Sequence, residues 1–476
     1  MHRMTGYDAA FLYDERPDEP QHTLKVCVLG PEASAAYTLD RTRTFIRSRL
    51  VDLPPLRWRA VRVPLDLYHP VWVEDPSLDL HHHVRRRAVP QPAGRTELCE
   101  EISEIASTPL DPQRPLWELW MLEGYEGDKV VGVLKISHAL ADGAASKRLL
   151  EMLFAQRPLD GEMRAQGEGS RSVDGEATPS RRTLVTDALR DRARAGRELL
   201  RLGRATHVAR RALRENPVAR LYRGRRISML ASPPTPFAGR PSEKRVFYFV
   251  TVPLEEAREI RRDLHCTVTD TILATAAGAL RSYLKHHRAL PGLPTLAHMP
   301  ASIRGGDEQG EWGNRITTRP LSLPTHIADP VDRLRAASQV VEEVKQDLAR
   351  RRGANLEDWL RWLPPYAAKG MGRLARAFVR LRPEFPGGIS ITSVRGPAAK
   401  LQAPSGAIEN FISVGHVKYV AGLNITVWSY DGKLNFGLYA CPTTVPDLPL
   451  FADMIAASFE DLRKAATREA ARVDAA

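Results

Sequence analysis

The residues best suited to chemistry lie in the stretch KISHALADG, residues 135–143. His138 stands there with Ser137 before it, Asp142 four residues later and Gly143 next. An imidazole can accept a proton from a hydroxyl group near neutral pH, and a carboxylate can orient that imidazole or fix the turn around it. A lone histidine in front of a helix is more often structural than catalytic, so the surrounding sequence has to decide between these interpretations.

The segments on either side of this stretch predict how His138 is held. VVGVLKIS, residues 130–137, is rich in β-branched residues and predicts a strand. ASKRLLEMLF, residues 145–154, has apolar residues at helical spacing and predicts a helix. His138 is therefore expected at a strand-to-helix junction, where a rigid scaffold presents side chains to a cleft. Gly143 would allow a close backbone approach or an unusual φ in that turn.

Several other kinds of site are excluded by their missing patterns. No serine lies in a GxSxG elbow, and no HExxH, EF-hand, Walker or GxGxxG pattern occurs. His81, His82 and His83 invite a metal interpretation, but adjacent residues on a strand point to opposite faces, so we expect no metal site there. The four cysteines are widely separated and form no CxxC pair, which favours free thiols in a reducing compartment.

The length and the charge of the chain limit its number of domains and its possible partners. The chain has 476 residues, which favours two domains. The formal net charge of +12 suits nucleic acid, an anionic membrane surface or a polyanionic small molecule. We find no nucleic-acid-binding motif, so we expect no nucleic-acid partner. No apolar stretch of about 20 residues occurs, and the N-terminus lacks a signal core, which together predict a cytoplasmic protein.

The composition divides the chain into three parts. Residues 1–160 alternate between strand-like and helix-like segments, and residues 240–476 do so again. Between them, residues 161–239 hold a polar linker, up to about residue 180, and then an arginine-rich helical segment. In the third part, ITVWSY and KLNFGLYA joined by DGK predict a β-hairpin.

Two helical segments leave their role open. The arginine-rich segment from residue 181 suits either a solvated helix bridging two domains or a helix lying on an anionic membrane. Residues 354–385 place Trp359 and Trp362 among arginines, just before Pro364 and Pro365. That pattern slightly favours a membrane interface or a lipid tunnel over a core helix with a solvated back.

The histidine stretch also carries a family resemblance. RPLWELWMLEGYEGDKVVGVLKISHALADG resembles the segment that ends in HHxxxDG in bacterial wax ester synthase/diacylglycerol acyltransferases, whose Pro-Leu-Trp corresponds to Pro115, Leu116 and Trp117. Further segments resemble that family in the same order: YDAAFLYDE, VTDTILATAAGALRSYL, MPASIRGGDEQGEWGNRITTRPLSLPT, ITSVRGP and GLNITVWSYDGKLNFGL. HxxxDG alone recurs across CoA-dependent acyltransferases and condensation domains, so the ordered set is the more specific signal.

The resemblance implies both a fold and a reaction. The fold is mixed α/β, with two chloramphenicol-acetyltransferase-like domains and a central tunnel at their interface. The reaction is acyl transfer from acyl-CoA, a substrate, to the hydroxyl of diacylglycerol or of a long-chain alcohol, and no cofactor is implied. Basic charge would attract the CoA phosphates, and peripheral association with the inner face of the membrane or with a lipid droplet would bring the lipid acceptor.

The resemblance also assigns roles to individual residues. His138 is the general base, and Asp142 holds the loop rather than relaying protons. The positions that support the motif are Gly143, Ser137, Thr269, Asp270 and Asn314. The positions at the substrate pocket are Pro115, Leu116 and Trp117.

Three departures from the family pattern keep alternatives open. Ser137 replaces the first histidine, Thr269 replaces an asparagine, and Ser393 with Arg395 replace the asparagine and first proline of Ser-Asn-Val-Pro-Gly-Pro. The alternatives are a catalytically weakened homologue that binds lipid or a partner, and an acyltransferase for a polyketide-like or glycosylated alcohol. No pattern encodes the acceptor, the chain length or the oligomeric state.

Overall fold

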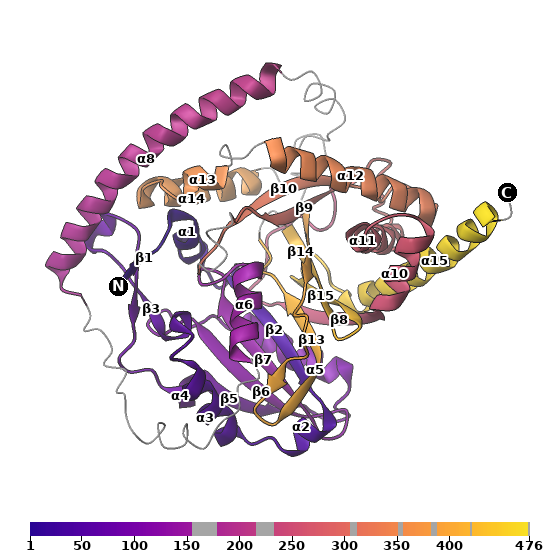
Figure 1. Cartoon of the computed structure of the whole chain (residues 1–476), viewed down its shortest axis with the longest axis horizontal. Helices are drawn as coiled ribbons and strands as arrows, with labels where there is room; N and C mark the ends of the chain where they lie inside the picture. Colours follow the sequence, from indigo (N-terminus) through magenta and orange to yellow (C-terminus); the bar gives the residue numbers. More distant parts are fainter. Residues whose placement is uncertain are drawn as a thin grey trace.

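Two six-stranded mixed sheets organise the protein (Figure 1). The computed structural model describes residues 1–154, 179–215, 233–304, 312–350, 356–381, 388–418 and 421–474. The polar linker expected before residue 180 falls almost wholly outside these residues. The strands and helices predicted around His138, in the third part and in the DGK hairpin are confirmed.

The first sheet carries the strand that leads to His138. Its strands, in spatial order, are β12 (Gln402–Ala403), β13 (Gly406–Val414), β2 (His22–Leu29), β7 (Lys129–Ser137), β6 (Trp117–Tyr125) and β5 (Val84–Ala88). Neighbours pair antiparallel except β5 with β6. Strand β2 is buried along its whole length, so its polar residues His22, Thr23 and Lys25 are buried together with its apolar ones.

The second sheet is built from the C-terminal half. Its strands, in spatial order, are β10 (Ile316–Leu323), β9 (Thr295–Ser302), β11 (Gly388–Arg395), β14 (Ala421–Tyr430), β15 (Lys433–Ala440) and β8 (Val246–Pro253). β11 runs parallel to both of its neighbours, and the remaining pairs are antiparallel. Since β12 and β13 follow β11 in the chain but belong to the first sheet, the C-terminal half contributes two strands to its neighbour. The division of the chain at residues 160 and 240 stays a prediction.

Helices cover the two sheets and form two large cores. The helices of the first half are α1 (Gly6–Asp14), α2 (Pro31–Ala35), α3 (Leu39–Arg49), α4 (Leu80–His83), α5 (Arg95–Ser107) and α6 (Gly143–Leu153). Those of the second half are α10 (Leu254–Asp263), α11 (Val268–His286), α12 (Pro330–Arg350), α13 (Leu356–Leu360), α14 (Pro365–Leu381) and α15 (Leu448–Asp474). Helix α5 packs on β8 and so joins the two halves.

A small third sheet and two short 3-10 helices complete the N-terminal half. The sheet contains β1 (His2–Arg3), β4 (Val71–Glu74) and β3 (Trp58–Val61), and the short helices are η1 (Pro54–Arg57) and η2 (Pro64–Asp66). The histidines at 81–83 lie in helix α4, not in the expected strand, because Asp79 caps a short helix at this point. All four cysteines are free thiols.

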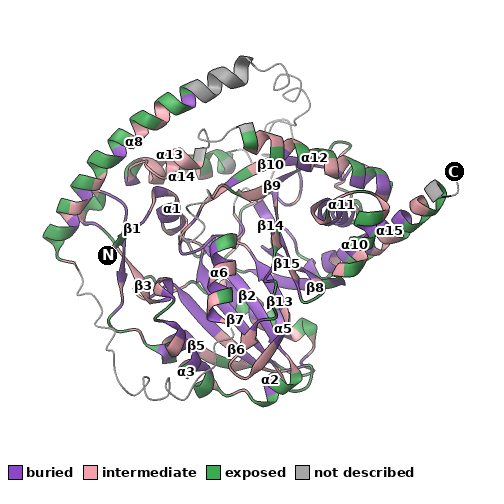
Figure 2. Cartoon of the chain, in the orientation of Figure 1, coloured by how far each residue is buried: buried purple, intermediate pink, exposed green. Residues whose placement is uncertain are grey.

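The arginine-rich segment forms the long helix α8 (Arg181–Glu215) along one edge of the molecule, with one buried side and an exposed outer face (Figures 1 and 2). Its inner side packs Leu184 against β4 and Ala188 beside Tyr68. Thr206 accepts a hydrogen bond from the indole of Trp359 on α13 at 3.1 Å. These contacts favour the bridging interpretation of this helix over the membrane interpretation.

Within the segment 354–385, the exposed apolar residues that the structure describes lie on α14 and not at the tryptophans. Trp359 and Trp362 are half-buried, and the slight preference for a membrane interface or a lipid tunnel at this segment stays a prediction. On α14, Leu374 is 71 % exposed, Phe378 43 % and Leu381 82 %. Among the described residues, no helix is both long and apolar enough to cross a membrane.

Candidate active site

His138 occupies the predicted junction. β7 ends at Ser137, the backbone N–H of His138 donates to the carbonyl of Gln21 at 2.8 Å, and α6 begins at Gly143. Asp142 is the N-cap of α6, where its Oδ1 accepts the N–H of Ala145 at 2.8 Å. The imidazole is half-buried, so part of it remains accessible.

Asn314 determines the tautomer of His138. Its Nδ2 donates to the backbone carbonyl of His138 at 2.7 Å and to Oδ1 of Asp8 at 2.8 Å. The amide nitrogen is therefore committed to two acceptors, and the amide oxygen lies 3.0 Å from Nδ1 of His138. Since this oxygen can only accept, Nδ1 carries the proton and Nε2 keeps a lone pair. A neutral imidazole with a free Nε2 is the form that a general base requires.

Asp8 is placed by the first turn of α1. Thr5 caps that helix, accepting the N–H of Asp8 at 3.1 Å and donating from Oγ1 to Asp8 Oδ2 at 2.6 Å. Burial raises the pKa of Asp8, and the hydrogen bonds from Thr5 and Asn314 oppose that rise. Gly6 lets this helix approach α13, because a Cβ there would meet the carbonyl oxygen of Leu360.

Two further rings and one cation surround the imidazole. Phe11 of α1 stacks on His138 with centroids 4.4 Å apart, and His416 meets it edge to face at 4.7 Å. The ammonium of Lys418 lies 5.2 Å from the Phe11 centroid. Burial, followed by the charge of Lys418, lowers the pKa of His138 to about 4. The ring is therefore neutral at physiological pH and able to accept a proton.

Asp142 joins the two halves of the molecule. Its Oδ2 accepts from the guanidinium of Arg304 at 2.9 Å and from the backbone N–H of Arg315 at 2.8 Å. Arg304 also donates to the carbonyl of Gly313 at 2.6 Å. In the described part of the chain Asp142 makes no hydrogen bond to His138, so the geometry favours a positioning role, in line with the expectation.

The neighbouring motif residues lie close by but do not touch the imidazole's nitrogens. The Ser137 hydroxyl accepts the N–H of Ala139 at 3.3 Å. The φ of Gly143 is not left-handed, and a Cβ there would meet only Val394, at an ordinary 3.6 Å. The expectation that Gly143 serves an unusual φ or a close backbone approach is therefore wrong.

Thr269 and Asp270 belong to a helix cap. Asp270 and Thr267 form a reciprocal capping box at the start of α11, with hydrogen bonds of 2.8 and 3.2 Å. Within the described ranges, neither Thr269 nor Asp270 forms a hydrogen bond to His138. The structure thus separates these two residues from the histidine, whereas it brings Asn314 into direct contact with it.

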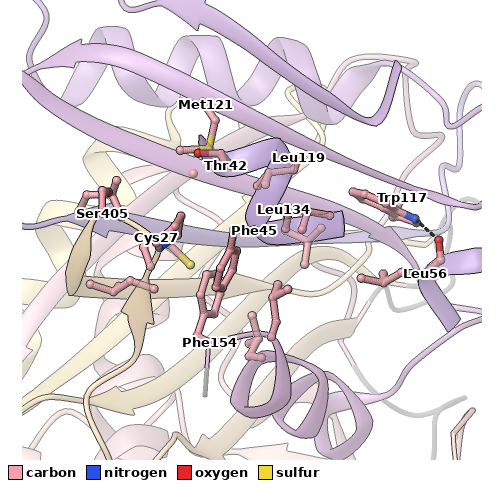
Figure 3. Close-up of a pocket in the computed structure, with 18 residues that line it drawn as sticks. Cys27, Thr42, Phe45, Leu56, Trp117, Leu119, Met121, Leu134, Phe154 and Ser405 are labelled. Carbon is pink, nitrogen blue, oxygen red and sulfur yellow. Dashed lines mark hydrogen bonds between the residues drawn. The ribbon is translucent and has the colours of Figure 1, made fainter. Parts of the chain in front are cut away.

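Trp117 lines an apolar cavity on one face of the first sheet (Figure 3). Its indole donates to the carbonyl of Leu56 at 2.7 Å, and His83 stacks on it at 4.5 Å. The cavity measures about 40 Å³, and other residues around it are Cys27, Phe45, Leu119, Met121, Gly132, Leu134 and Phe154. Leu134 precedes His138 by four residues, which is about 13 Å along the strand. Pro115 and Leu116 are buried but are not among the residues that line this cavity, and the Leu116 carbonyl accepts the N–H of Ser137.

One grouping of potential metal ligands occurs among the described residues. His286, His287 and Asp447 have ligand atoms within 4.8 Å of one another. Asp447 is already hydrogen-bonded to Tyr283 at 2.6 Å and to His287 at 3.2 Å. The cluster lies at the C-terminal end of α11 and contributes nothing to the His138 site.

Family models match most of the chain. A model of the wax ester synthase/diacylglycerol acyltransferase catalytic domain matches residues 4–272, and a model of the corresponding C-terminal domain matches residues 312–463. The chain belongs to the wax ester synthase/diacylglycerol acyltransferase family. A Mycobacterium tuberculosis protein provisionally named a diacylglycerol O-acyltransferase is 32 % identical to it, over 99 % of this chain and 98 % of that protein.

Solved structures share the fold. The wax ester synthase/diacylglycerol acyltransferase of Marinobacter aquaeolei superposes with a TM-score of 0.66 at 24 % identity, covering 98 % of this chain and all of that one. The first condensation domain of the calcium-dependent antibiotic synthetase gives a TM-score of 0.57 at 15 % identity, covering 98 % and 96 %. The expected mixed α/β fold of two acyltransferase-like domains is confirmed.

Most of the residues that surround the His138 imidazole were not identified by the sequence analysis. Asp8 and Phe11 lie in the opening stretch YDAAFLYDE, which resembles the family and could have marked them. His416 and Lys418 follow β13 in a stretch that gave no signal, because only the fold brings residues so distant in the chain to the same site.

Proposed function

We propose that this wax ester synthase/diacylglycerol acyltransferase transfers a fatty acyl group from acyl-CoA to the hydroxyl of diacylglycerol, of a long-chain alcohol, or of both. The observation that carries the proposal is the hydrogen bond between Nδ1 of His138 and Asn314, which leaves Nε2 free to act as a base. Membership of the family supports the same reaction.

The chemistry needs one base that also returns the proton. An alcohol barely ionises at neutral pH, so Nε2 of His138 takes its proton as the oxygen attacks the thioester carbonyl. A carbon–oxygen bond forms, the tetrahedral intermediate collapses, and the carbon–sulfur bond breaks. The departing CoA thiolate then takes the proton from Nε2, so the histidine ends the cycle neutral. Lys418 supports this step electrostatically, since its charge opposes retention of the proton by the imidazole.

The apolar cavity beside Trp117 suits the acyl chain. Gly132 and Leu134 line it from one face of β7, and His138 follows the end of that strand. At about 40 Å³ it holds only a few water molecules, so a fatty acyl chain has to displace the flexible side chains of Met121 and Phe154.

Ser137 adjoins His138 in the chain, but among the described residues none of the departures from the family pattern forms a hydrogen bond with its imidazole. Within the described ranges, the hydroxyl of Ser137 bonds only to the backbone N–H of Ala139, and Ser393 is exposed on β11. Thr269 belongs to the start of α11. These placements favour an active enzyme over a catalytically weakened homologue.

Peripheral membrane association forms part of the proposal. Leu374, Phe378 and Leu381 are exposed on one helix, α14, among the basic residues Arg373 and Arg380. Apolar side chains flanked by arginines suit the boundary between headgroups and acyl chains of an anionic membrane. Such a contact would bring a lipid acceptor to the enzyme.

Thiol release tests the reaction directly. The purified chain is given palmitoyl-CoA with dioleoylglycerol or hexadecanol, and CoA and ester are measured together. We expect His138→Ala to lower turnover by about a hundredfold or more. His286→Ala, which changes an exposed histidine on α11, should retain activity. Absence of thiol release by the parent chain with both acceptors, or full activity of the His138 variant, would refute the proposal.

A further inference from the structure

Four arginines surround an open pocket beside α14. Arg373, Arg376 and Arg380 are spaced three and four residues apart and so share one face of the helix, while Arg16 follows α1. Leu381 adds an apolar wall, and the pocket measures about 380 Å³. The mechanism derived above uses none of these residues.

The charge of this arginine pocket is only partly balanced. Arg376 is held by Asp14, with its Nη1 2.6 Å from Oδ1. In the part of the chain that the structure describes, Arg16 and Arg373 form no ion pair. The buried carboxyl of Glu19 has a pKa raised to about 7 by burial, so it offsets less positive charge than an ordinary glutamate would. The pocket therefore favours an anion carrying more than one charge.

Helix α1 connects the pocket with the imidazole. Asp14, which holds Arg376, lies three residues after Phe11, which stacks on His138. Three residues of helix span about 4.5 Å. The ammonium of Lys418, 5.2 Å from the Phe11 centroid, adds a cation beside this ring. Its charge affects the pKa of both His138 and Glu19, which places it within electrostatic reach of both ends.

We propose that the arginine pocket binds the phosphate groups of acyl-CoA and aims the thioester along α1 toward His138. This inference rests on the proposed function. Guanidinium groups pair with phosphate oxygens through paired N–H donors, so several arginines together suit a ligand with several phosphates. Acyl-CoA carries its phosphates at one end of a flexible arm and its thioester at the other, which matches a basic pocket set apart from the base. A phospholipid headgroup shares the phosphate chemistry but does not need a connection to His138.

A thioester substrate without phosphate groups can distinguish the role of this pocket from that of the rest of the site. Arg16→Gln combined with Arg373→Gln removes two arginines that form no ion pair with any described residue. Arg190→Gln combined with Arg258→Gln is the control, because it removes the same charge from exposed positions on α8 and α10. We expect the first pair to raise KM for palmitoyl-CoA about tenfold. KM for palmitoyl-N-acetylcysteamine, which has no phosphate, should stay unchanged.

Direct binding gives a readout that needs no turnover. Calorimetry with CoA should show a matching loss of affinity in the Arg16/Arg373 variant and none in the control variant. An unchanged KM for palmitoyl-CoA, or an equal rise for both thioesters, would overturn the proposal. Lost binding to phosphatidylglycerol vesicles with intact CoA affinity would also overturn it, since the pocket would then hold a lipid phosphate. If the parent chain binds CoA through these arginines but releases no thiol with any acceptor, the pocket stands and the proposed function fails.

Discussion

Asn314 donates a hydrogen bond from Nδ2 to Oδ1 of Asp8 at 2.8 Å, and this contact controls the chemistry of a third residue, His138. A second hydrogen bond, from the Asn314 backbone N–H to the same Asp8 oxygen at 2.9 Å, holds the residue in place. With its nitrogen committed, the amide can offer only oxygen to Nδ1 of His138. Asp8 is thus a positioning residue that acts through Asn314.

Removing the amide should disturb the tautomer. In Asn314→Leu, Nδ1 loses its acceptor, so the ring can rotate or carry its proton on Nε2. We expect kcat to fall about a hundredfold with little change in KM for acyl-CoA. Nitrogen NMR of His138 should show mixed tautomers in the variant and a single one in the parent. The matched control is Asn410→Leu on β13, whose amide bonds to Thr251 instead. A parent-like kcat with a parent-like NMR spectrum in Asn314→Leu would show that the contact is not needed.

The pH below which kcat/KM falls, the acid limb of its pH profile, should depend on Lys418. His138 has a pKa of about 4, lowered first by burial and then by Lys418, so the base stays neutral until the pH approaches that value. Lys418→Met removes the repelling charge and should raise the pKa of His138 toward 6.5, moving the acid limb of kcat/KM to higher pH. Steady-state rates between pH 4 and pH 8 measure the shift. An acid limb that does not move would mean that Lys418 has no electrostatic effect on the base.

Stability should also depend on pH through this imidazole. The unfolded chain binds a proton on His138 below about pH 6.5, whereas the folded chain binds it only near pH 4. The folded protein is therefore fully stable above pH 6.5 with respect to this group, and it loses stability as the pH falls from 6.5 toward 4. Urea unfolding at pH 7 and pH 5 should show a smaller loss for His138→Gln than for the parent. An equal loss in both proteins would exclude His138 as a source of acid sensitivity.

The acyl cavity can be narrowed at Gly132. A Cβ on this residue would lie 3.5 Å from the sulfur of Met121, so one carbon fits, while a larger side chain enters the cavity. We expect Gly132→Leu to lower kcat/KM for palmitoyl-CoA about tenfold and to spare butyryl-CoA. Gly292→Leu is the control, because nothing lies within 4 Å of a Cβ at that position. If both thioesters lose activity equally, the acyl chain binds elsewhere.

Membrane binding should depend on α14. Leu374→Glu with Phe378→Glu places two charges on its exposed apolar face and should reduce flotation with phosphatidylglycerol vesicles about tenfold at low salt. The control is Leu200→Glu on α8, since Leu200 and Leu374 are both 71 % exposed. Loss of binding in the control instead would assign the membrane contact to α8. A parent chain that fails to float at low salt would contradict membrane association altogether.

The local part of this site was predictable and the assembled part was not. The strand VVGVLKIS and the helix after Asp142 follow from periodicity, so His138 at their junction follows as well. Asn314 was found only through the resemblance, because its contact with His138 spans 176 positions in the chain. His416 had no local signal at all.

The histidine triplet shows where local sequence patterns no longer predict the structure. The strand expected at His81–His83 is a short helix, because the capping carboxylate of Asp79 outweighs the pattern there. Trp359 and Trp362 pack near α8, where the Trp359 indole donates to Thr206 and Trp362 contacts the cluster that contains Ala188, and a membrane or lipid-tunnel role of this segment stays a prediction.

The position of strand β13 determines whether the protein can be produced as separate fragments. It covers the free edge of β2 with six paired positions, although it lies almost 400 residues later in the chain. A fragment ending near residue 272, where the catalytic-domain match stops, would leave the backbone donors and acceptors of β2 bare and prone to pair with other molecules. It would also lack Asn314, so it would be both aggregation-prone and without a defined base. Production of an active enzyme from two separately folded halves is therefore not expected, and ribosomal synthesis must be nearly complete before the catalytic histidine gains its final surroundings.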